Sequence, residues 1–191
     1  MTSGKKLTRD TIVQALVDAL KPLNYVHAFF EGGATAFNRI DEWSDIDLYL
    51  VVDDEKVGET FREVEKALTS LSPIKQKYDV PQTGWPDVFQ AFYRLEDASE
   101  YLIIDVAILK LSSPEKFLEP EIHGNVVFFF NRSNKIKPLP LDKDALVKKL
   151  LGRLERLQAR FDMFNSFIQK EINRGNHLEA INPYYDLTLA A

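Results

Sequence analysis

The chain has 191 residues, 45% of them hydrophobic and 28% charged, and its 24 basic and 29 acidic side chains give a net charge of −5. This length suits one domain with a hydrophobic core and a smaller appendage. An acidic chain argues against a broad nucleic-acid-binding surface, and the lack of cysteine excludes disulfides, thiolate catalysis and cysteine-ligated zinc. No apolar run approaches the roughly 20 residues of a membrane helix and no signal-peptide pattern opens the chain, so we expect a cytoplasmic protein.

The first 140 residues mix helix and strand patterns. Apolar residues recur at helical spacing over 9–20, where Thr8 is the expected N-cap, and over 59–71. Runs rich in strand-forming residues predict strands, in chain order, at 25–31, 45–52, 88–95, 101–109 and 125–130. The third and fourth of these flank a short polar turn, which indicates an antiparallel hairpin.

Only helical patterns follow Pro140. Asp142 is a plausible N-cap for one long helix over 143–173 that Gly175 ends, and a further helix is expected from Leu178 onward. Mixed strands and helices followed by helices alone predict an α+β domain and then a helical one, with the boundary near Pro140.

Three aspartates occupy apolar strand patterns. Asp45 and Asp47 open the run of residues 45–52, and Asp105 interrupts a later one. Alternate residues of a strand face the same side, so Asp45 and Asp47 share a face while Ile46 and Leu48 point into a core. Three carboxylates at one place repel one another, and a hard divalent cation such as Mg²⁺ removes that conflict. The alternatives are turn chemistry for the first two, and an edge position or a buried basic partner for Asp105.

The pair Gly32-Gly33 follows the first predicted strand. Glycines let backbone N–H groups approach a ligand closely, and a helix that begins there favours phosphate. A simple tight turn is the alternative. The Walker pattern is not present, so this is not a P-loop.

The stretch from Glu31 to Val52, together with Ile-Ile-Asp-Val-Ala around Asp105, resembles the signature of the polymerase-beta-like nucleotidyltransferase superfamily. In that signature a Gly-Gly or Gly-Ser turn precedes Asp-x-Asp in a hydrophobic strand, and a third aspartate follows on a later strand. The C-terminal part is similar to the small-molecule branch, such as aminoglycoside adenylyltransferases. Gly33 stands where many members have serine, and the helical part ends earlier than is usual for that branch, so we expect a truncated helical domain.

The resemblance implies a mixed sheet flanked by helices over 1–140, the catalytic domain, and a helical domain over 141–191. It implies that the three aspartates bind two Mg²⁺ ions, and that Asp105 also helps to deprotonate the acceptor. Gly32, Gly33 and Ser44 would hold the triphosphate. The implied reaction moves a nucleoside monophosphate, AMP from ATP, to a hydroxyl of a small-molecule acceptor and releases pyrophosphate.

A basic stripe on the long predicted helix adds two further candidates. Lys149 and Arg153, with Arg156 and Arg160, fall on one side of it. They would either clamp the phosphates, as we predict for Lys149 and Arg153, or form a solvated helix face.

Two other functions stay open at this point. One is an antitoxin-like nucleotidyltransferase that modifies a partner protein, and the other is a non-catalytic nucleotide-binding module. The expected partners are a nucleoside triphosphate and a hydroxylated acceptor, without membrane or nucleic acid. The sequence leaves the oligomeric state open, a homodimer included.

Overall fold

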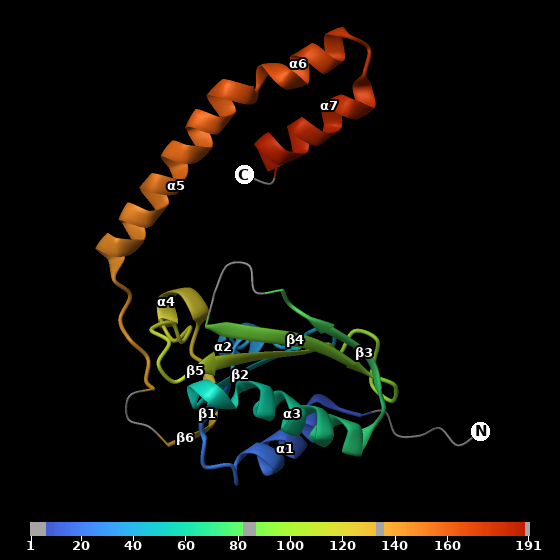
Figure 1. Ribbon diagram of the computed structural model, residues 1–191, viewed down its shortest axis with the longest axis vertical. Coiled ribbons are helices and arrows are strands. Elements are labelled where there is room, and N and C mark those ends of the chain that lie inside the picture. Colours follow the sequence, from blue (N-terminus) through green and yellow to red (C-terminus); the bar gives the residue numbers. More distant parts are fainter. Residues whose placement is uncertain (1–6, 82–86, 133–135, 190–191) are drawn as a thin grey trace, which may run out of the picture. The chain divides into compact units, whose positions relative to one another are not determined.

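The computed structural model describes residues 7–81, 87–132 and 136–189 (Figure 1). The chain divides into two compact units, Met1–Pro140 and Leu141–Ala191. Each unit is described here by itself.

A six-stranded sheet forms the centre of the first unit. Its strands, in chain order, are β1 (Val26–Glu31), β2 (Ile46–Val52), β3 (Ile74–Asp79), β4 (Val88–Leu95), β5 (Ile104–Lys110) and β6 (Val127–Asn131). Across the sheet they follow the order β3-β4-β5-β2-β1-β6. Strands β2 and β5 pair in parallel and the other neighbours pair antiparallel. The sheet is therefore mixed, and the expected β4–β5 hairpin is confirmed.

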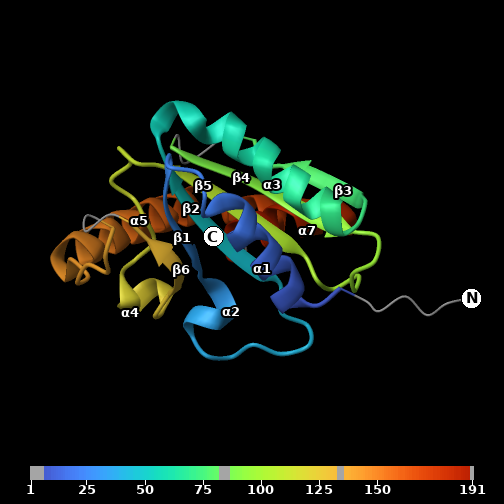
Figure 2. The ribbon, with the colours of Figure 1, turned by 90° about the horizontal axis from the view of Figure 1, so that it is seen from below.

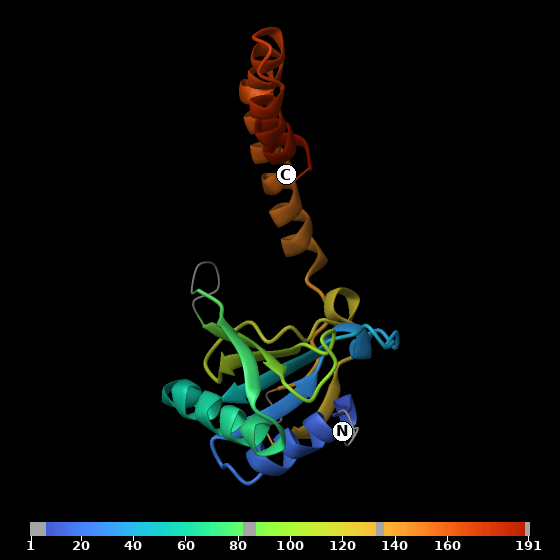
Figure 3. The same ribbon diagram turned by 90° about the vertical axis from the view of Figure 1, so that its right-hand side faces the viewer.

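Two helices cover one face of this sheet. Helices α1 (Arg9–Leu20) and α3 (Val57–Leu71) lie next to each other across the strands, as the views in Figures 2 and 3 show. The side chain of Thr8 accepts a hydrogen bond from the Thr11 N–H, so the predicted N-cap of α1 is confirmed. Shorter helical segments, α2 (Gly33–Ala36), η1 (Asp54–Lys56) and α4 (Pro120–His123), connect the strands. The α+β class with a helix-flanked mixed sheet is as predicted.

The helix-covered face holds the main hydrophobic core. Its buried members include Ile12 and Leu16 of α1 and Val64 and Leu68 of α3. Every second residue of the central strands packs against them, namely Ile46, Leu48, Leu50, Ile104, Val106 and Ile108. The period-two alternation of a strand thus sends all the apolar residues at these positions to one side.

A smaller apolar cluster covers part of the opposite face. Phe117, Leu118 and Ile136 pack there against Val51 and Leu109, near the carboxyl ends of β2 and β5. This cluster does not cover the amino ends of β2 and β5, where Asp47 and Asp105 lie.

The second unit consists of helices α5 (Lys143–Phe164), α6 (Ser166–Asn173) and α7 (His177–Tyr184), followed by a π-helical turn at Tyr185–Leu189. Asp142 caps α5, and Gly175 ends α6 with a φ of 79°. The prediction of one continuous helix over 143–173 is wrong, because Asn165 separates α5 from α6. Asparagine and serine side chains compete for backbone hydrogen bonds, which makes Asn165-Ser166 a weak point in a helix.

The described helices include none with the length and apolar character needed to cross a membrane.

Candidate functional site

Two of the three predicted aspartates lie opposite each other on neighbouring strands. Asp47 of β2 is the register partner of Asp105 in the parallel pair β2–β5. Register partners in a sheet face the same side, and strands are spaced about 4.8 Å apart. Both side chains therefore project from the face that α1 and α3 do not cover, at the amino ends of the two strands. The sequence predicted that the strands carry these residues, and the fold places them side by side.

The surroundings of this pair disfavour its charged form. Burial raises the pKa of Asp105 to about 7, and the neighbouring carboxylates of Asp47 and Asp45 add to that rise. Burial and the Asp45 charge also raise the pKa of Asp47. The pKa of Tyr49, two residues along β2, is raised to about 12 by burial and by the two aspartates. A cation at this place would reverse the penalty that each carboxylate imposes on the others.

Asp105 has a hydrogen-bond partner that the sequence reasoning missed. Nε2 of Gln90 on β4 lies 2.8 Å from each carboxylate oxygen of Asp105 and donates to them. This bond opposes the rise in the Asp105 pKa. The available signal was an uncharged polar residue, Gln90, inside the largely apolar strand pattern of residues 88–95. The buried basic partner considered for Asp105 is not what the structure provides.

The Gly32-Gly33 turn is built around Asp47. The Gly32 N–H donates to the backbone carbonyl of Asp47 at 2.9 Å, so this amide is already used within the protein. Gly33 begins α2 with a φ of 51°, and a Cβ added there would lie 1.7 Å from Asp47 Oδ2. The backbone of Gly33 therefore lies directly against the carboxylate, and only glycine leaves room for it. Of the two amides predicted to hold phosphate, that of Gly32 is already hydrogen-bonded to the Asp47 carbonyl. Gly33 begins a helix, and the first N–H groups of a helix lack intrahelical partners.

Arg9 fixes the position of Asp45 and was not anticipated. Its guanidinium pairs with the buried carboxylate of Glu31 and donates to the backbone carbonyl of Asp45. These contacts join the start of α1 to the end of β1 and to the residue before β2. Asp45 directly precedes β2, which begins at Ile46. A buried glutamate next to the glycine turn was the signal for such a partner.

The other predicted nucleotide-binding residues are Ser44, Lys149 and Arg153. The hydroxyl of Ser44 donates to Asp41 Oδ1 at 2.7 Å within the loop before β2. Lys149 and Arg153 are exposed residues of α5 in the second unit, and their contact with phosphate stays a prediction. Within the first unit, the structure thus brings together Asp47, Asp105 and Gly33.

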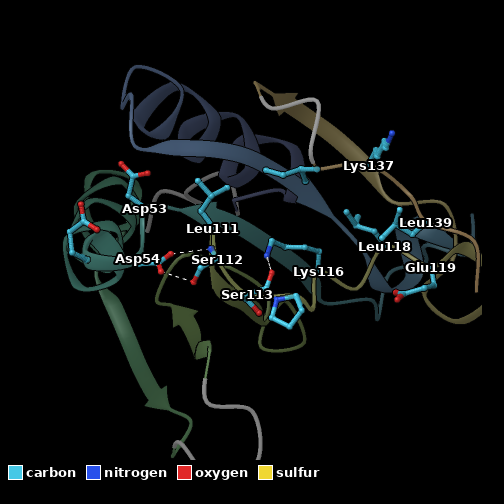
Figure 4. A pocket seen from close by; sticks show the side chains of 13 residues that line it. Asp53, Asp54, Leu111, Ser112, Ser113, Lys116, Leu118, Glu119, Lys137 and Leu139 are labelled. Carbon is cyan, nitrogen blue, oxygen red and sulfur yellow. Dashed lines mark hydrogen bonds between the residues drawn. The ribbon is translucent and has the colours of Figure 1, made fainter. Parts of the chain in front are cut away.

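A cavity of about 710 Å³ occupies the opposite end of the sheet (Figure 4). Residues that follow β2 and β5 line it, among them Asp54 and Ser112, which hydrogen-bond to each other. Neither Asp47 nor Asp105 belongs to this cavity. The aspartates are the stronger candidate site because burial raises the pKa of both Asp47 and Asp105.

Among the described residues, one group of three gathers possible metal-ligand atoms within 4.8 Å of one another: Glu115, Glu119 and His123. Asp45, Asp47 and Asp105 do not meet this spacing together in the described structure. The register pair Asp47 and Asp105 is therefore the core of the candidate site, with Asp45 directly before β2.

Comparison with protein-family models and with curated proteins gave no match to this chain.

Proposed function

We propose that the protein is a metal-dependent nucleotidyltransferase that moves a nucleoside monophosphate, AMP from ATP, to a hydroxyl of a small molecule. The observation that carries this proposal is the pairing of Asp47 with Asp105 in register on the face of the sheet away from the helices. Two carboxylates held side by side on a rigid sheet suit a phosphoryl-transfer site. The same reaction would release pyrophosphate.

The residues present fit divalent cations at this place. Burial and mutual repulsion raise the pKa of both Asp47 and Asp105, which is the expected property of carboxylates whose counter-ion is a metal. Asp47 and Asp105, with Asp45 beside them, offer only oxygen ligands, which Mg²⁺ prefers. Two Mg²⁺ ions, when bound, would supply Lewis-acid stabilisation of charge on the attacking and leaving oxygens.

The protein's own groups have separate tasks in this proposal. Gln90 holds Asp105 in one orientation, so that its carboxylate can accept the proton of an acceptor hydroxyl. The hydroxyl oxygen then forms a bond to the α-phosphorus, and the bond from that phosphorus to the pyrophosphate oxygen breaks. Gly33 lets the backbone approach Asp47, and its amide is oriented at the start of α2. A backbone donor of this kind stabilises phosphate without side-chain rearrangement.

Nucleotide binding tests the proposal before any acceptor is known. In a calorimetric titration, ATP should bind in the presence of Mg²⁺ and should bind at least tenfold more weakly after chelation, since ligand affinity depends on the carboxylate-bound ion. Asp47→Asn should have the same effect as chelation. Asp53→Asn, at the other end of β2, is the matched control and should leave ATP binding unchanged.

Transfer itself is then followed as pyrophosphate release with a panel of hydroxylated acceptors. Asp105→Asn should lower the rate by about 10²- to 10⁴-fold, the usual contribution of a general base. ATP binding that ignores both Mg²⁺ and Asp47 would instead identify a metal-independent nucleotide-binding module. Transfer only to one co-purified protein would identify the antitoxin-like alternative, and full transfer by Asp105→Asn would overturn the assignment.

A further inference from the structure

A second, separate group of ligand-type side chains lies in the segment that follows β5. Glu119 is the N-cap of α4, and His123 is the last residue of that helix, one turn away on the same side. Glu115 comes from the preceding loop, and its Oε1 accepts a hydrogen bond from the Phe117 N–H at 3.0 Å. One oxygen of each glutamate and one imidazole nitrogen lie within 4.8 Å of one another. The proposed nucleotidyltransferase function uses none of these three residues.

The Oε2 atom of Glu119 is the strongest argument for a cation at this group. It is buried from solvent and has no hydrogen-bond partner among the described residues. His123 Nε2 is 3.9 Å from it, which is too far for a hydrogen bond. An unpaired buried carboxylate oxygen is costly, and a bound cation removes that cost.

The spacing suits a metal ion. Ligands of zinc lie about 2.0–2.2 Å from the ion, so two ligands of a tetrahedral ion are about 3.3–3.6 Å apart. The 3.9 Å between Glu119 Oε2 and His123 Nε2 is close to this spacing. The three ligand atoms lie within 4.8 Å of one another, so metal binding needs them to close by up to about 1.5 Å, which rotation of the glutamate side chains supplies.

Neighbouring residues hold this segment in place, and one of the three ligands lines the cavity. The ring of Phe117 meets the His123 ring edge to face, with centroids 5.4 Å apart, and on its other side packs against Tyr49. Gly124 and Asn125 continue the chain against the backbone of Ala36. Glu119 also lines the 710 Å³ cavity, where it lies across from Asp54 (Figure 4). The segment is therefore anchored, and Glu119 links the group to the cavity.

We propose that Glu115, Glu119 and His123 bind one divalent transition-metal ion, with an open coordination position toward the cavity. The imidazole ligand favours zinc-like ions, whereas Mg²⁺ and Ca²⁺ favour sites made only of oxygen. Three protein ligands and one open position are the usual pattern of a reactive, rather than purely structural, zinc site. The proposal is independent of nucleotidyl transfer, because the two sites use different residues.

Calorimetric titration of the full, chelator-treated chain with Zn²⁺ tests the site. In the presence of excess Mg²⁺, which occupies the aspartate site, one equivalent of Zn²⁺ should still bind. Glu119→Gln and His123→Gln should each weaken Zn²⁺ binding at least tenfold, since loss of a ligand should cost no less than loss of a supporting contact. His177→Gln, an exposed histidine at the start of α7, is the matched control and should bind as the wild type does.

Asp105→Asn separates this proposal from the preceding one. It should lower the transfer rate by about 10²- to 10⁴-fold but leave Zn²⁺ binding intact. Glu119→Gln should weaken Zn²⁺ binding and leave the transfer rate unchanged. Melting temperatures of the metal-free variants show whether each still folds, and Glu115→Gln replaces any variant that does not. Wild-type Zn²⁺ affinity in both Glu119→Gln and His123→Gln would overturn the site, as would the absence of saturable one-to-one binding. That result would leave Glu119 and His123 as a helix ion pair only.

Discussion

The helix-covered face of the sheet and its opposite face are made by the same strands but carry different residues. Along β2, Ile46, Leu48 and Leu50 are buried under α1 and α3, whereas Asp47 and Tyr49 between them point the other way. Strand β5 repeats the pattern, with Asp105 between Ile104 and Val106. Packing on the apolar face thus stabilises the fold. This offsets the cost of placing two carboxylates close together on the other face. A rigid apolar backing also limits how far those carboxylates can move apart.

Neighbouring substitutions in β2 test this division most strongly. Leu48→Ala should lower the free energy of unfolding by about 2–5 kcal/mol, because Leu48 is 1% exposed and its removal leaves a cavity. Asp47→Asn should cost no stability but should abolish Mg²⁺-dependent ATP binding. Urea unfolding of both variants, followed by circular dichroism, measures the contrast. An equal loss of stability in the two variants would mean that the second face is also a core.

The pH dependence of stability sharpens the comparison next. The pKa of Asp105 rises from 3.8 to about 7 on folding, so the folded state binds the proton more tightly. Its contribution to stability is complete below pH 3.8 and is lost as the pH rises through 7. Asp105→Asn should therefore stabilise the metal-free protein at pH 8, on the order of 2–4 kcal/mol, and have little effect near pH 4.

Urea unfolding in the presence of a chelator at both pH values measures this effect. Asp54 at the far end of the sheet is the control, because its hydrogen bonds from Ser112 lower its pKa. A lowered pKa gives stability that is present at neutral pH and is lost on acidification. Asp54→Asn should therefore destabilise at pH 8, the opposite sign to Asp105→Asn. The same sign for both variants would contradict the proposed difference between the two ends.

The glycine turn offers the smallest of these effects. Gly33→Ala should lower the free energy of unfolding by about 1–2 kcal/mol, since the φ of 51° at this position is unfavourable for a residue with a Cβ. The added Cβ also displaces the Asp47 carboxylate, so Mg²⁺-dependent ATP binding should weaken at least tenfold.

Gly152→Ala in α5 is the matched control for Gly33→Ala. Its Cβ would meet only the flexible end of Arg156, at 3.6 Å. Because alanine is favoured over glycine in a helix interior, Gly152→Ala should raise the free energy of unfolding by about 0.5–1 kcal/mol and leave ATP binding unchanged. Thermal unfolding with calorimetric ATP titration measures both variants. Normal ATP binding in Gly33→Ala would show that the Gly33–Asp47 contact has no role in the site.

Local patterns in the sequence predicted most of the elements and part of the site. Runs of strand-forming residues predicted β1, β2, β4, β5 and β6, period-two alternation turned Asp47 away from the core, and Thr8 and Gly175 marked helix ends correctly. These features depend on residues close in the chain, so their physics is visible in a short window. The break between α5 and α6 at Asn165 was missed because it depends on a weak local preference that apolar periodicity conceals.

Tertiary structure decided how the site is assembled. Only the parallel register of β2 and β5 places Asp47 next to Asp105, and only the β4–β5 pairing brings Gln90 to that carboxylate. The same is true of the Arg9 contacts and of the use of the Gly32 amide by Asp47. Such contacts join residues far apart in the chain, where no local pattern specifies the partner, and strand order and register select it. The sequence by itself therefore determined which residues carry charge on the strands, and the fold determined which of those charges meet.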